Sequence, residues 1–316
     1  MVAVALQAPL FPIDQPVMPE ERQIGRGLSI ELLRHRLDDA THQWLIGPRR
    51  TGKTSVAKAA LSRLRADGVV ALDIDMSKLG ISTEQQLAGE IARQAQAAHA
   101  GEPRVGRRLT RFVGRHVGDA NRLGKTLGDL GFRDEGDALT AVAALLAGAD
   151  DGSPGLGSVL EALSLHAHAT ERRSVILIDE VHLLADVAGC EREIARWARD
   201  ADTPIVFAFA GSEESAVRAL REVGRPLAAI GEELALPDIS TEDWLYGLRR
   251  RFVEAAVVVD GEQVLSIVEA SDGHPRRTML ICAGVHSAAA NAPGREATKA
   301  LVELAIHDAR DDHSWT

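Results

Sequence analysis

The sequence contains little cysteine and few aromatic side chains. Its two cysteines, Cys190 and Cys282, exclude a disulfide framework, and aromatic residues make up 3% of the chain. Two thiols suit a reducing compartment, so we expect a cytoplasmic protein. Because large rings are scarce, the core must consist mainly of alanine, valine, leucine and isoleucine. The chain has 316 residues, 45% of them hydrophobic, which is enough for one large domain or two smaller ones.

A membrane span, a signal peptide and an excess of basic charge are also lacking. No apolar run reaches the ~20 residues that a transmembrane helix needs. Residues 1–22 are broken by prolines and carry no basic region ahead of an apolar one, which excludes a signal peptide and predicts an extended arm. The net charge of −10 argues against nucleic-acid binding by the whole surface, although a local basic patch could still bind.

A glycine-rich basic loop is the most informative stretch. Residues 47–54, GPRRTGKT, fit the pattern G-x-x-x-x-G-K-S/T of a phosphate-binding loop (Walker A). Residues 43–46 are predicted to form a short buried strand and 53–66 a helix, which is the setting that this loop requires. Gly47 and Gly52 let the backbone turn tightly and approach a phosphate, and the helix N-terminus adds partial positive charge. The alternative is a glycine-containing turn with a solvated lysine.

Each position of this loop has an expected task. Lys53 would reach the β- and γ-phosphates of a nucleotide, and the Thr54 hydroxyl would ligate Mg²⁺. The nucleotide would contact the whole stretch Gly47, Pro48, Arg49, Arg50, Thr51, Gly52, Lys53, Thr54 and Ser55.

A second motif supplies the carboxylates that such a loop needs. In RRSVILIDEVHLL (172–184), an apolar run typical of a central parallel strand is followed by Asp179 and Glu180 (Walker B). Ligands of open α/β sheets bind at the carboxyl ends of the strands. Asp179 would hold Mg²⁺ through its water shell, and Glu180 would orient and polarise the attacking water. Alternatively, Asp179 caps a helix.

Together the two motifs resemble the AAA+ and STAND superclass of P-loop ATPases. The sequence looks most like the archaeal-type ATPases related to origin-recognition initiators, over roughly residues 22–310. The alternation of strand and helix patterns itself predicts a parallel sheet with helices on both faces. The resemblance implies the five-strand order 5-1-4-3-2, a small C-terminal helical lid, and hydrolysis of ATP to ADP and phosphate with Mg²⁺.

The resemblance also implies a base-binding segment near the N-terminus. Ile24, Gly25 and Arg26 look like the hydrophobic–Gly–Arg box that packs near adenine, although Gly27 stands where the family usually has an acid. An ordinary loop entering a helix is the alternative.

A further stretch, ASDGHPRRTMLIC, resembles the second sensor at the start of a lid helix. Gly273 and Pro275 look like a Gly-x-Pro element near the base. Arg276 would reach the phosphates, with Arg277 as the alternative; two arginines in a first helical turn oppose the helix dipole, which an anion nearby would explain. Both could instead be solvated.

Two more roles come from the resemblance. Ser212 ends the strand in TPIVFAFAGSEES, where the family places a polar sensor for the γ-phosphate, or else it caps the next helix. Arg225, with Arg221 second, is the candidate arginine finger for a neighbouring subunit. A solvated arginine is the alternative, and LAAI at 227–230 puts activation in trans in doubt.

We expect three parts along the chain: the arm 1–22, an ATPase core 23–239 with an insertion at about 101–156, and a helical lid 240–316. Ser240, with Asp243 three residues later, should cap the first lid helix. Strands are expected near 43–46, 69–76, 174–179, 204–210 and 233–236. Helices are expected near 53–66, 83–99, 157–170, 213–222, 260–271, 275–290 and 296–310.

The insertion carries a basic segment at 104–133. It holds Arg104, Arg107, Arg108, Arg111, Arg115, Arg122, Lys125 and Arg133 against Asp119 and Asp129. Such a segment could contact nucleic acid, an acidic partner or a membrane surface. We favour a solvated insertion packed on the acidic body.

The sequence therefore predicts a P-loop ATPase whose nucleotide state is coupled to lid or subunit rearrangement of a partner. A slowly hydrolysing STAND-like switch or scaffold, or a DNA-associated initiator-like or transposition-helper-like ATPase, is the alternative. A small-molecule kinase is disfavoured by the adjacent acids Asp179 and Glu180. Because no effector or winged-helix domain follows the lid, we expect a protein partner, self-association, or a longer parent chain.

Overall fold

Five parallel strands form one sheet in the order β2-β3-β4-β1-β5. The structure is a computed structural model that describes residues 10–13, 16–17, 23–99, 155–312 and 315. The order is the predicted 5-1-4-3-2 seen from the other edge, so the predicted fold class is confirmed. The strands are β1 (Gln43–Ile46), β2 (Val70–Asp75), β3 (Ser174–Asp179), β4 (Ile205–Ala210) and β5 (Glu232–Ala235).

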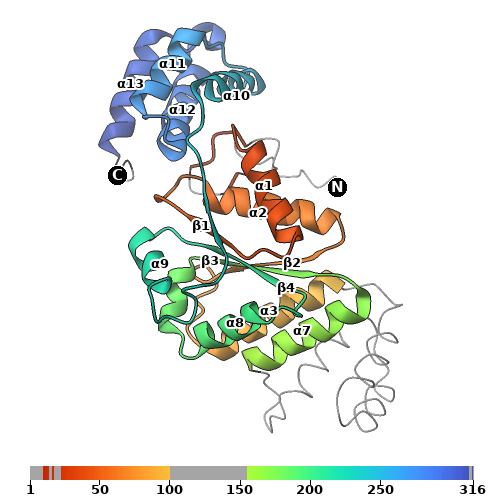
Figure 1. The fold of residues 1–316 in the computed structure, drawn as a ribbon. Coiled ribbons are helices and arrows are strands. Elements are labelled where there is room, and N and C mark those ends of the chain that lie inside the picture. Colours follow the sequence, from red (N-terminus) through yellow and green to blue (C-terminus); the bar gives the residue numbers. More distant parts are fainter. Residues whose placement is uncertain (1–9, 14–15, 18–22, 100–154, 313–314, 316) are drawn as a thin grey trace, which may run out of the picture. The chain divides into compact units, whose positions relative to one another are not determined.

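The central strands are buried on both faces. Every residue of β3 and β4 is buried, as their continuous apolar sequences predict. Alternate side chains of the sheet, such as Ile176 and Phe207, belong to one core with residues of three helices. These helices are α3 (Glu84–His99), α7 (Leu156–Thr170) and α8 (Cys190–Arg199), and they lie on the same side of the sheet (Figure 1).

The remaining helices include several that the sequence predicts within a few residues and others for which it gave no range. The predicted helix at 53–66 is α2 (Lys53–Ala66), and the one at 213–222 is the shorter α9 (Glu214–Leu220). The others are α1 (Gly27–Asp38), η2 (Val181–Asp186), α10 (Thr241–Glu254), α11 (Gly261–Ala270), α12 (Pro275–Ala290), η3 (Pro293–Arg295) and α13 (Lys299–Asp311).

The chain forms two compact units. The sheet unit comprises Leu32–Gly47 and Ala60–Ala235. The helical unit comprises Met1–Glu31, Pro48–Ala59 and Leu236–Thr316. The phosphate loop after Gly47 and the first half of α2 therefore belong to the helical unit. The predicted division into a core and a lid at residue 240 stays a prediction.

The helical unit has its own core, which the C-terminal helices share with an N-terminal residue. Trp244 and Phe252 of α10, Ile267 of α11 and Val285 of α12 are buried together in it. Phe11 packs on Phe252 with ring centroids 4.9 Å apart. Helix α10 begins as predicted, because the Ser240 hydroxyl accepts a hydrogen bond from the Asp243 N–H at 3.0 Å.

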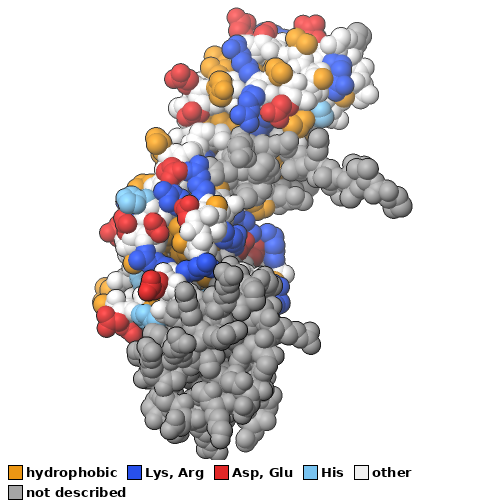
Figure 2. Space-filling model, turned by 90° about the vertical axis from the view of Figure 1, so that its right-hand side faces the viewer, with side chains coloured by type: hydrophobic (Ala, Val, Ile, Leu, Met, Phe, Trp, Pro, Cys, Tyr) orange, Lys and Arg blue, Asp and Glu red, His pale blue; other side chains and the backbone are white. Residues whose placement is uncertain are grey.

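Three predicted features are not described by the structure. The basic segment 104–133, nearly all of the insertion at 101–156 and most of the arm 1–22 lie outside the described residues. None of the helices in the described part of the chain is long and apolar enough to cross a membrane. On the face drawn in Figure 2, acidic and basic side chains are interspersed over the described surface.

His42 connects β1 to two neighbouring elements through both ring nitrogens. The Phe207 N–H donates to Nδ1 at 2.9 Å, so Nε2 must carry the proton that bonds to the Ala198 carbonyl, also at 2.9 Å. Burial lowers the pKa of His42 below its usual 6.5, and the bond to Ala198 offsets this in part. Protonation would therefore destroy the acceptor that the Phe207 amide requires.

We expect the free energy of unfolding to fall as the pH drops from 7 towards 5. The pKa of His42 is lower in the folded state than in the unfolded state, where it is near 6.5. The stabilisation that results is therefore fully present above pH 6.5 and is lost as the pH falls through the folded-state pKa. The variant His42→Gln keeps an acceptor and a donor but cannot titrate, so its melting temperature should depend less on pH. Equal slopes for wild type and His42→Gln would contradict the assignment.

Candidate functional site

The loop between β1 and α2 has the backbone of an anion-binding loop. Gly47 and Gly52 have φ of 150° and 96°, and a Cβ at either position would meet nothing within 4 Å. The glycines are therefore required by the backbone conformation and not by crowding. Helix α2 begins at Lys53, and its first intrahelical bond runs from the Val56 N–H to the Gly52 carbonyl at 3.0 Å. The N–H groups of that first turn have no intrahelical acceptor, which makes this end of the helix suited to an anion.

Lys53 is held against the loop that it follows. Its side chain is 6% exposed, and its ammonium donates to the carbonyl of Pro48. The Thr51 hydroxyl donates to the same carbonyl at 3.0 Å. Thr54 lies partly exposed in the first turn of α2, while Pro48, Arg49 and Arg50 are exposed. The three cationic residues Arg49, Arg50 and Lys53 thus all come from this short loop and the start of α2.

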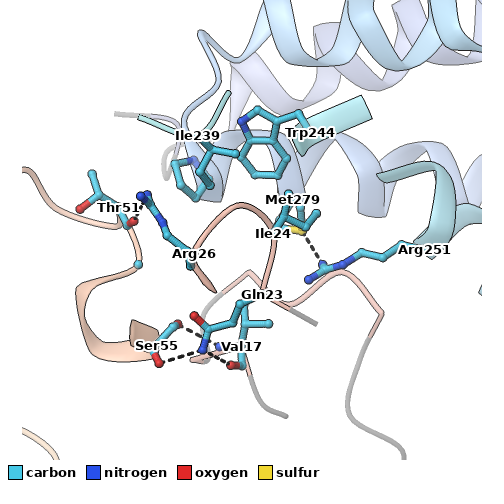
Figure 3. Close-up of a pocket in the computed structure, with 12 residues that line it drawn as sticks. Val17, Gln23, Ile24, Arg26, Thr51, Ser55, Ile239, Trp244, Arg251 and Met279 are labelled. Atoms are coloured by element: carbon cyan, nitrogen blue, oxygen red, sulfur yellow. Dashed lines mark hydrogen bonds between the residues drawn. The ribbon is translucent and has the colours of Figure 1, made fainter. Parts of the chain in front are cut away.

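A pocket in the helical unit begins beside this loop. Its walls combine apolar and polar residues from the N-terminal segment, the phosphate loop, residues 239–251 and the start of α12 (Figure 3). The lining residues are Val17, Gln23, Ile24, Arg26, Thr51, Gly52, Ser55, Ile239, Trp244, Arg251, Pro275 and Met279. The structure therefore brings together parts of the predicted hydrophobic–Gly–Arg box, the phosphate loop and the Gly-x-Pro element, which are far apart in the sequence.

Arg26 joins two of these stretches through backbone carbonyls. It is 6% exposed, and its guanidinium donates to Thr51 at 2.9 Å and to the carbonyl of Pro237. Burial lowers the pKa of Arg26, and the charge of Asp238 partly offsets this. Beside it, Gly25 has φ of 63°, and a Cβ there would lie 2.8 Å from Ile239. Any other residue at position 25 would displace a wall of the pocket.

Gln23 and Val17 were missed by the sequence analysis. The Gln23 amide nitrogen donates to the Ser55 carbonyl at 2.8 Å and to the Val17 carbonyl at 3.2 Å. The Val17 N–H in turn donates to the Ser55 hydroxyl at 3.0 Å. The segment before the box is therefore bound to the first turn of α2. No local sequence pattern could have revealed the two pairs with Ser55, because their members lie 32 and 38 residues apart.

The start of α12 also contacts the phosphate loop. His274, the N-cap residue, lies with Nε2 3.2 Å from the Arg49 carbonyl. Burial lowers the pKa of His274, the hydrogen bond to the Arg49 carbonyl offsets this in part, and the charges of Arg277 and Arg276 lower the pKa further. The Trp244 indole donates to the carbonyl of Gly273, whose φ is 62°. His274 lies within the stretch ASDGHPRRTMLIC, but its contact with the Arg49 carbonyl is visible only in the folded structure.

The two candidate arginines of α12 have different surroundings. Arg276 is 8% exposed. Arg277 pairs with Asp272, donates to the Trp315 carbonyl at 2.9 Å and lies over the Trp315 ring. Arg277 is therefore engaged within the helical unit. Arg276, in the first turn of the same helix, stays the predicted phosphate contact.

In the sheet unit, the acids of the second motif lie where β3 ends. Asp179 is 3% exposed, and its Oδ1 accepts the Glu180 N–H at 3.0 Å. Glu180 has φ of 53°, and its Oε2 accepts both the hydroxyl of Ser212 at 2.8 Å and the Ser212 N–H at 3.2 Å. His182, another residue that the sequence analysis missed, lies with Nδ1 3.4 Å from the same oxygen.

These contacts correct two capping hypotheses. Ser212 does not cap α9, because that helix begins at Glu214 and its N-cap residue is Glu213, with no side-chain cap. The short helix η2 after β3 has Glu180 as its N-cap residue, so Asp179 does not cap it either. Asp179 instead accepts the backbone N–H of Glu180, and Ser212 donates to the Glu180 carboxylate.

The end of β2 adds a carboxylate that the sequence analysis did not single out. Asp75 pairs in register with Asp179 across the two strands. Its oxygens accept the N–H of Lys78 at 3.0 Å and lie 3.0 Å from the Lys78 ammonium. The hydrogen bond between the Lys78 ammonium and the Asp75 carboxylate raises the pKa of Lys78, and the charges of Asp179 and Asp73 add to the effect. The carboxyl edge of the sheet is thus acidic, with one lysine close by.

The candidate arginine fingers both form ion pairs within the sheet unit. Arg225 pairs with Glu191, whose pKa is raised by burial and lowered by Arg225. Arg221 pairs with Glu233 and lies over the Trp44 ring. A role for either on a neighbouring subunit stays a prediction.

The donor set is compatible with Mg²⁺. Within the described residues, no group of three or more histidine, cysteine, aspartate or glutamate side chains is arranged to hold a metal. Mg²⁺ is bound in many nucleotide sites by one or two protein oxygens, several waters and the phosphates, so it needs no such cluster. Thr54 and Asp179 offer the hydroxyl and carboxylate oxygens that it prefers.

The comparisons with known proteins agree with this geometry. The family model described as AAA domain matches residues 35–218, more than half of the chain. No curated protein matches the chain.

Several solved structures share the fold at low sequence identity. The Walker-type ATPase PABY2304 of Pyrococcus abyssi has a TM-score of 0.62 and 18% identity, covering 94% of this chain and 76% of that one. The Aeropyrum pernix ORC2 protein, in ADPNP–ADP complexes, has a TM-score of 0.58 and 15% identity, covering 96% and 71%. The Aeropyrum pernix ORC1 protein, in complex with DNA, has a TM-score of 0.53 and 17% identity, covering 92% and 68%.

Gly247→Ala should disturb the pocket although alanine favours helices. A Cβ at position 247 of α10 would lie 2.6 Å from Ile24, so this wall of the pocket must move. In the control Gly89→Ala the new Cβ meets nothing within 4 Å in α3, so that variant should gain up to about 1 kcal/mol of stability. We expect only Gly247→Ala to weaken nucleotide binding, measured by titration of a fluorescent ATP analogue. Unchanged affinity in that variant would show that Ile24 does not shape the site.

Proposed function

Because the chain belongs to the AAA domain family of P-loop ATPases, we propose that it binds ATP with Mg²⁺ and hydrolyses it to ADP and phosphate. One observation carries the proposal: the pocket of the helical unit is lined by residues of the phosphate loop, the Ile24–Arg26 box and the start of α12. An apolar pocket beside a helix N-terminus suits a nucleotide, whose base is planar and apolar and whose phosphates are anionic.

Phosphate recognition is assigned to the loop and to the first turn of α2. The N–H groups from Gly52 to Ser55 would bind phosphate oxygens. Lys53 would exchange the Pro48 carbonyl for the β- and γ-phosphates, a stronger partner because the bond is charge-assisted. Arg276, buried in the first turn of α12, would add a second positive charge. A phosphate beside Arg276 would offset the unfavourable position of that arginine at the positive end of a helix.

Hydrolysis is assigned to Glu180. The phosphate loop follows β1 and the two acids end β3, so both leave the same edge of a parallel sheet, where ligands of such sheets bind. Glu180 would accept a proton from a water whose oxygen bonds to the γ-phosphorus as the bond to the β–γ bridging oxygen breaks. Ser212 would hold the carboxylate in place through its two hydrogen bonds. Catalysis of this kind depends mainly on positioning and electrostatics.

Thr54 and Asp179 would hold Mg²⁺, the Thr54 hydroxyl directly and Asp179 through water. When bound, Mg²⁺ supplies positive charge to the phosphate oxygens. The role of this chain is to keep one hydroxyl and one buried carboxylate, which already accepts the Glu180 N–H, ready for the ion.

A slow nucleotide-dependent switch is the second candidate. It is favoured by the hydrogen bonds that Ser212 makes to Glu180, since a carboxylate held by two donors is less available to a water. A partner would then respond to the nucleotide state of the protein. Turnover in steady state separates the candidates, because an active motor hydrolyses many ATP molecules per minute and a switch about one or fewer.

DNA association is a narrower proposal. The Aeropyrum pernix ORC1 neighbour was solved in complex with DNA. In the present chain the basic segment 104–133 is the candidate contact, and each phosphate that it neutralises would add about −0.9 to the slope of log K against log salt. ATPase turnover with and without duplex DNA, at several salt concentrations, tests this.

Lys53→Ala should abolish ATP binding or weaken it severely, because it removes the cation that opposes the β- and γ-phosphate charge. Titration with a labelled ATP analogue measures the effect. The control Lys58→Ala lies in the same helix beyond its first turn and should bind as wild type does. Wild-type affinity in Lys53→Ala would refute the phosphate-loop assignment.

Glu180→Gln should bind ATP but hydrolyse it ~10²-fold more slowly or worse, the usual scale for a positioned general base. The amide keeps the shape and can still accept from Ser212, so only the charge is lost. Glu213→Gln, at the exposed N-cap position of α9, is the matched control and should hydrolyse normally. If Glu180→Gln released phosphate at the wild-type rate, Glu180 would have a structural role only.

A further inference from the structure

We propose that Gln23 makes the pocket selective for adenine, by accepting a hydrogen bond from the exocyclic amine of the base at its side-chain oxygen. The proposal rests on the proposed function, since it takes the pocket to hold the base of the nucleotide. It assigns a specificity-determining role to a residue outside the hydrophobic–Gly–Arg box.

The orientation of the Gln23 amide is fixed. An amide nitrogen has two N–H groups, and both are used here, one on the Ser55 carbonyl at 2.8 Å and one on the Val17 carbonyl at 3.2 Å. Turning the amide over would place its oxygen against two carbonyl oxygens, which repel it. The oxygen is therefore held on the side away from Ser55 and Val17 (Figure 3).

The side-chain oxygen of Gln23 is a buried acceptor. Within the part of the chain that the structure describes, no group donates a hydrogen bond to this Oε1. Buried acceptors are nearly always paired in folded proteins, because an unmade bond loses the hydration that water supplied. Gln23 lines the pocket, so a ligand in the pocket is the natural donor.

The remaining walls suit a purine. Ile24, Ile239 and Met279 line the pocket (Figure 3), and Pro275 contributes from the start of α12. Apolar walls of this kind bind a ring system with little regard to its polar substituents. Discrimination between bases must then come from a polar group at the edge of the ring, and Gln23 supplies one that can only accept.

The chemistry of the bases gives the direction of selectivity. Adenine carries an amino donor at position 6, whereas guanine carries a carbonyl acceptor there. Adenine would satisfy the Gln23 oxygen, while guanine would set two acceptors against each other. A site built to bond an N–H group rejects an analogue without it, because the protein group is left unpaired.

The test compares nucleotides that differ only at position 6. Wild-type protein is titrated with ATP, with purine riboside triphosphate, which has hydrogen in place of the amine, and with GTP, each competing against one labelled ATP analogue. We expect the purine compound to bind about tenfold more weakly than ATP, the factor that one net hydrogen bond gives, and GTP more weakly still. Equal affinity of the wild type for ATP and the purine compound would overturn the proposal.

Two variants separate the role of the acceptor from that of the local fold. In Gln23→Met the ratio of the two affinities should fall from about ten to about one, because ATP loses its partner and the purine compound loses nothing. Ser55→Ala removes the acceptor of the Val17 N–H while leaving Gln23 intact, so it should weaken both nucleotides alike and keep the ratio. A ratio that collapses in Ser55→Ala but persists in Gln23→Met would refute the role of Gln23.

The outcome also distinguishes this proposal from the proposed function. If the wild type binds no nucleoside triphosphate at all, the proposed function fails. If it binds ATP, GTP and the purine compound equally, ATP binding stands and only the selectivity of Gln23 is refuted. Because the wild-type titrations need no variant, the proposal remains falsifiable even if Gln23→Met does not fold.

Discussion

The backbone of residues 49–55 is the part of the helical unit on which the candidate site depends. Its carbonyls bind side chains from elsewhere in the chain: Arg26 binds Thr51, Gln23 binds Ser55, and His274 lies against Arg49. The geometry of a helix N-terminus leaves the opposite groups, the N–H groups, for an anion. One short segment thus uses its carbonyl oxygens to hold the pocket together, while its N–H groups are the proposed donors to a phosphate. A change that moves this backbone would alter both functions at once.

The sequence predicts the elements well because their signals are local. The apolar runs of β3 and β4 and the limits of α2 agree with the structure, since each depends on burial or on loop chemistry within a few residues. The strand order came from the resemblance, because periodicity within a strand carries no information about its neighbours. The contacts of Gln23 and His274 could not be predicted, since each joins residues that only the fold brings together.

Ser212 shows how a correct position can carry an incomplete interpretation. The sequence places it at the end of β4, and the structure agrees, but its hydroxyl and N–H both donate to Glu180 rather than capping α9. The sheet order explains this contact, because β3 and β4 are neighbours and their carboxyl ends meet at one edge. A small polar residue there can control where the Glu180 carboxylate points. Its proposed role as a sensor is then best understood as acting through Glu180.

Recognition and chemistry depend on different parts of this chain. The pocket, with Gln23, Arg26 and the start of α12, is built within the helical unit, whereas Glu180 and Ser212 are fixed by strands of the sheet unit. The proposed base selectivity would therefore depend on hydrogen bonds that include none of the residues proposed for hydrolysis. Because α2 begins in the helical unit and ends in the sheet unit, the phosphate loop is covalently continuous with both.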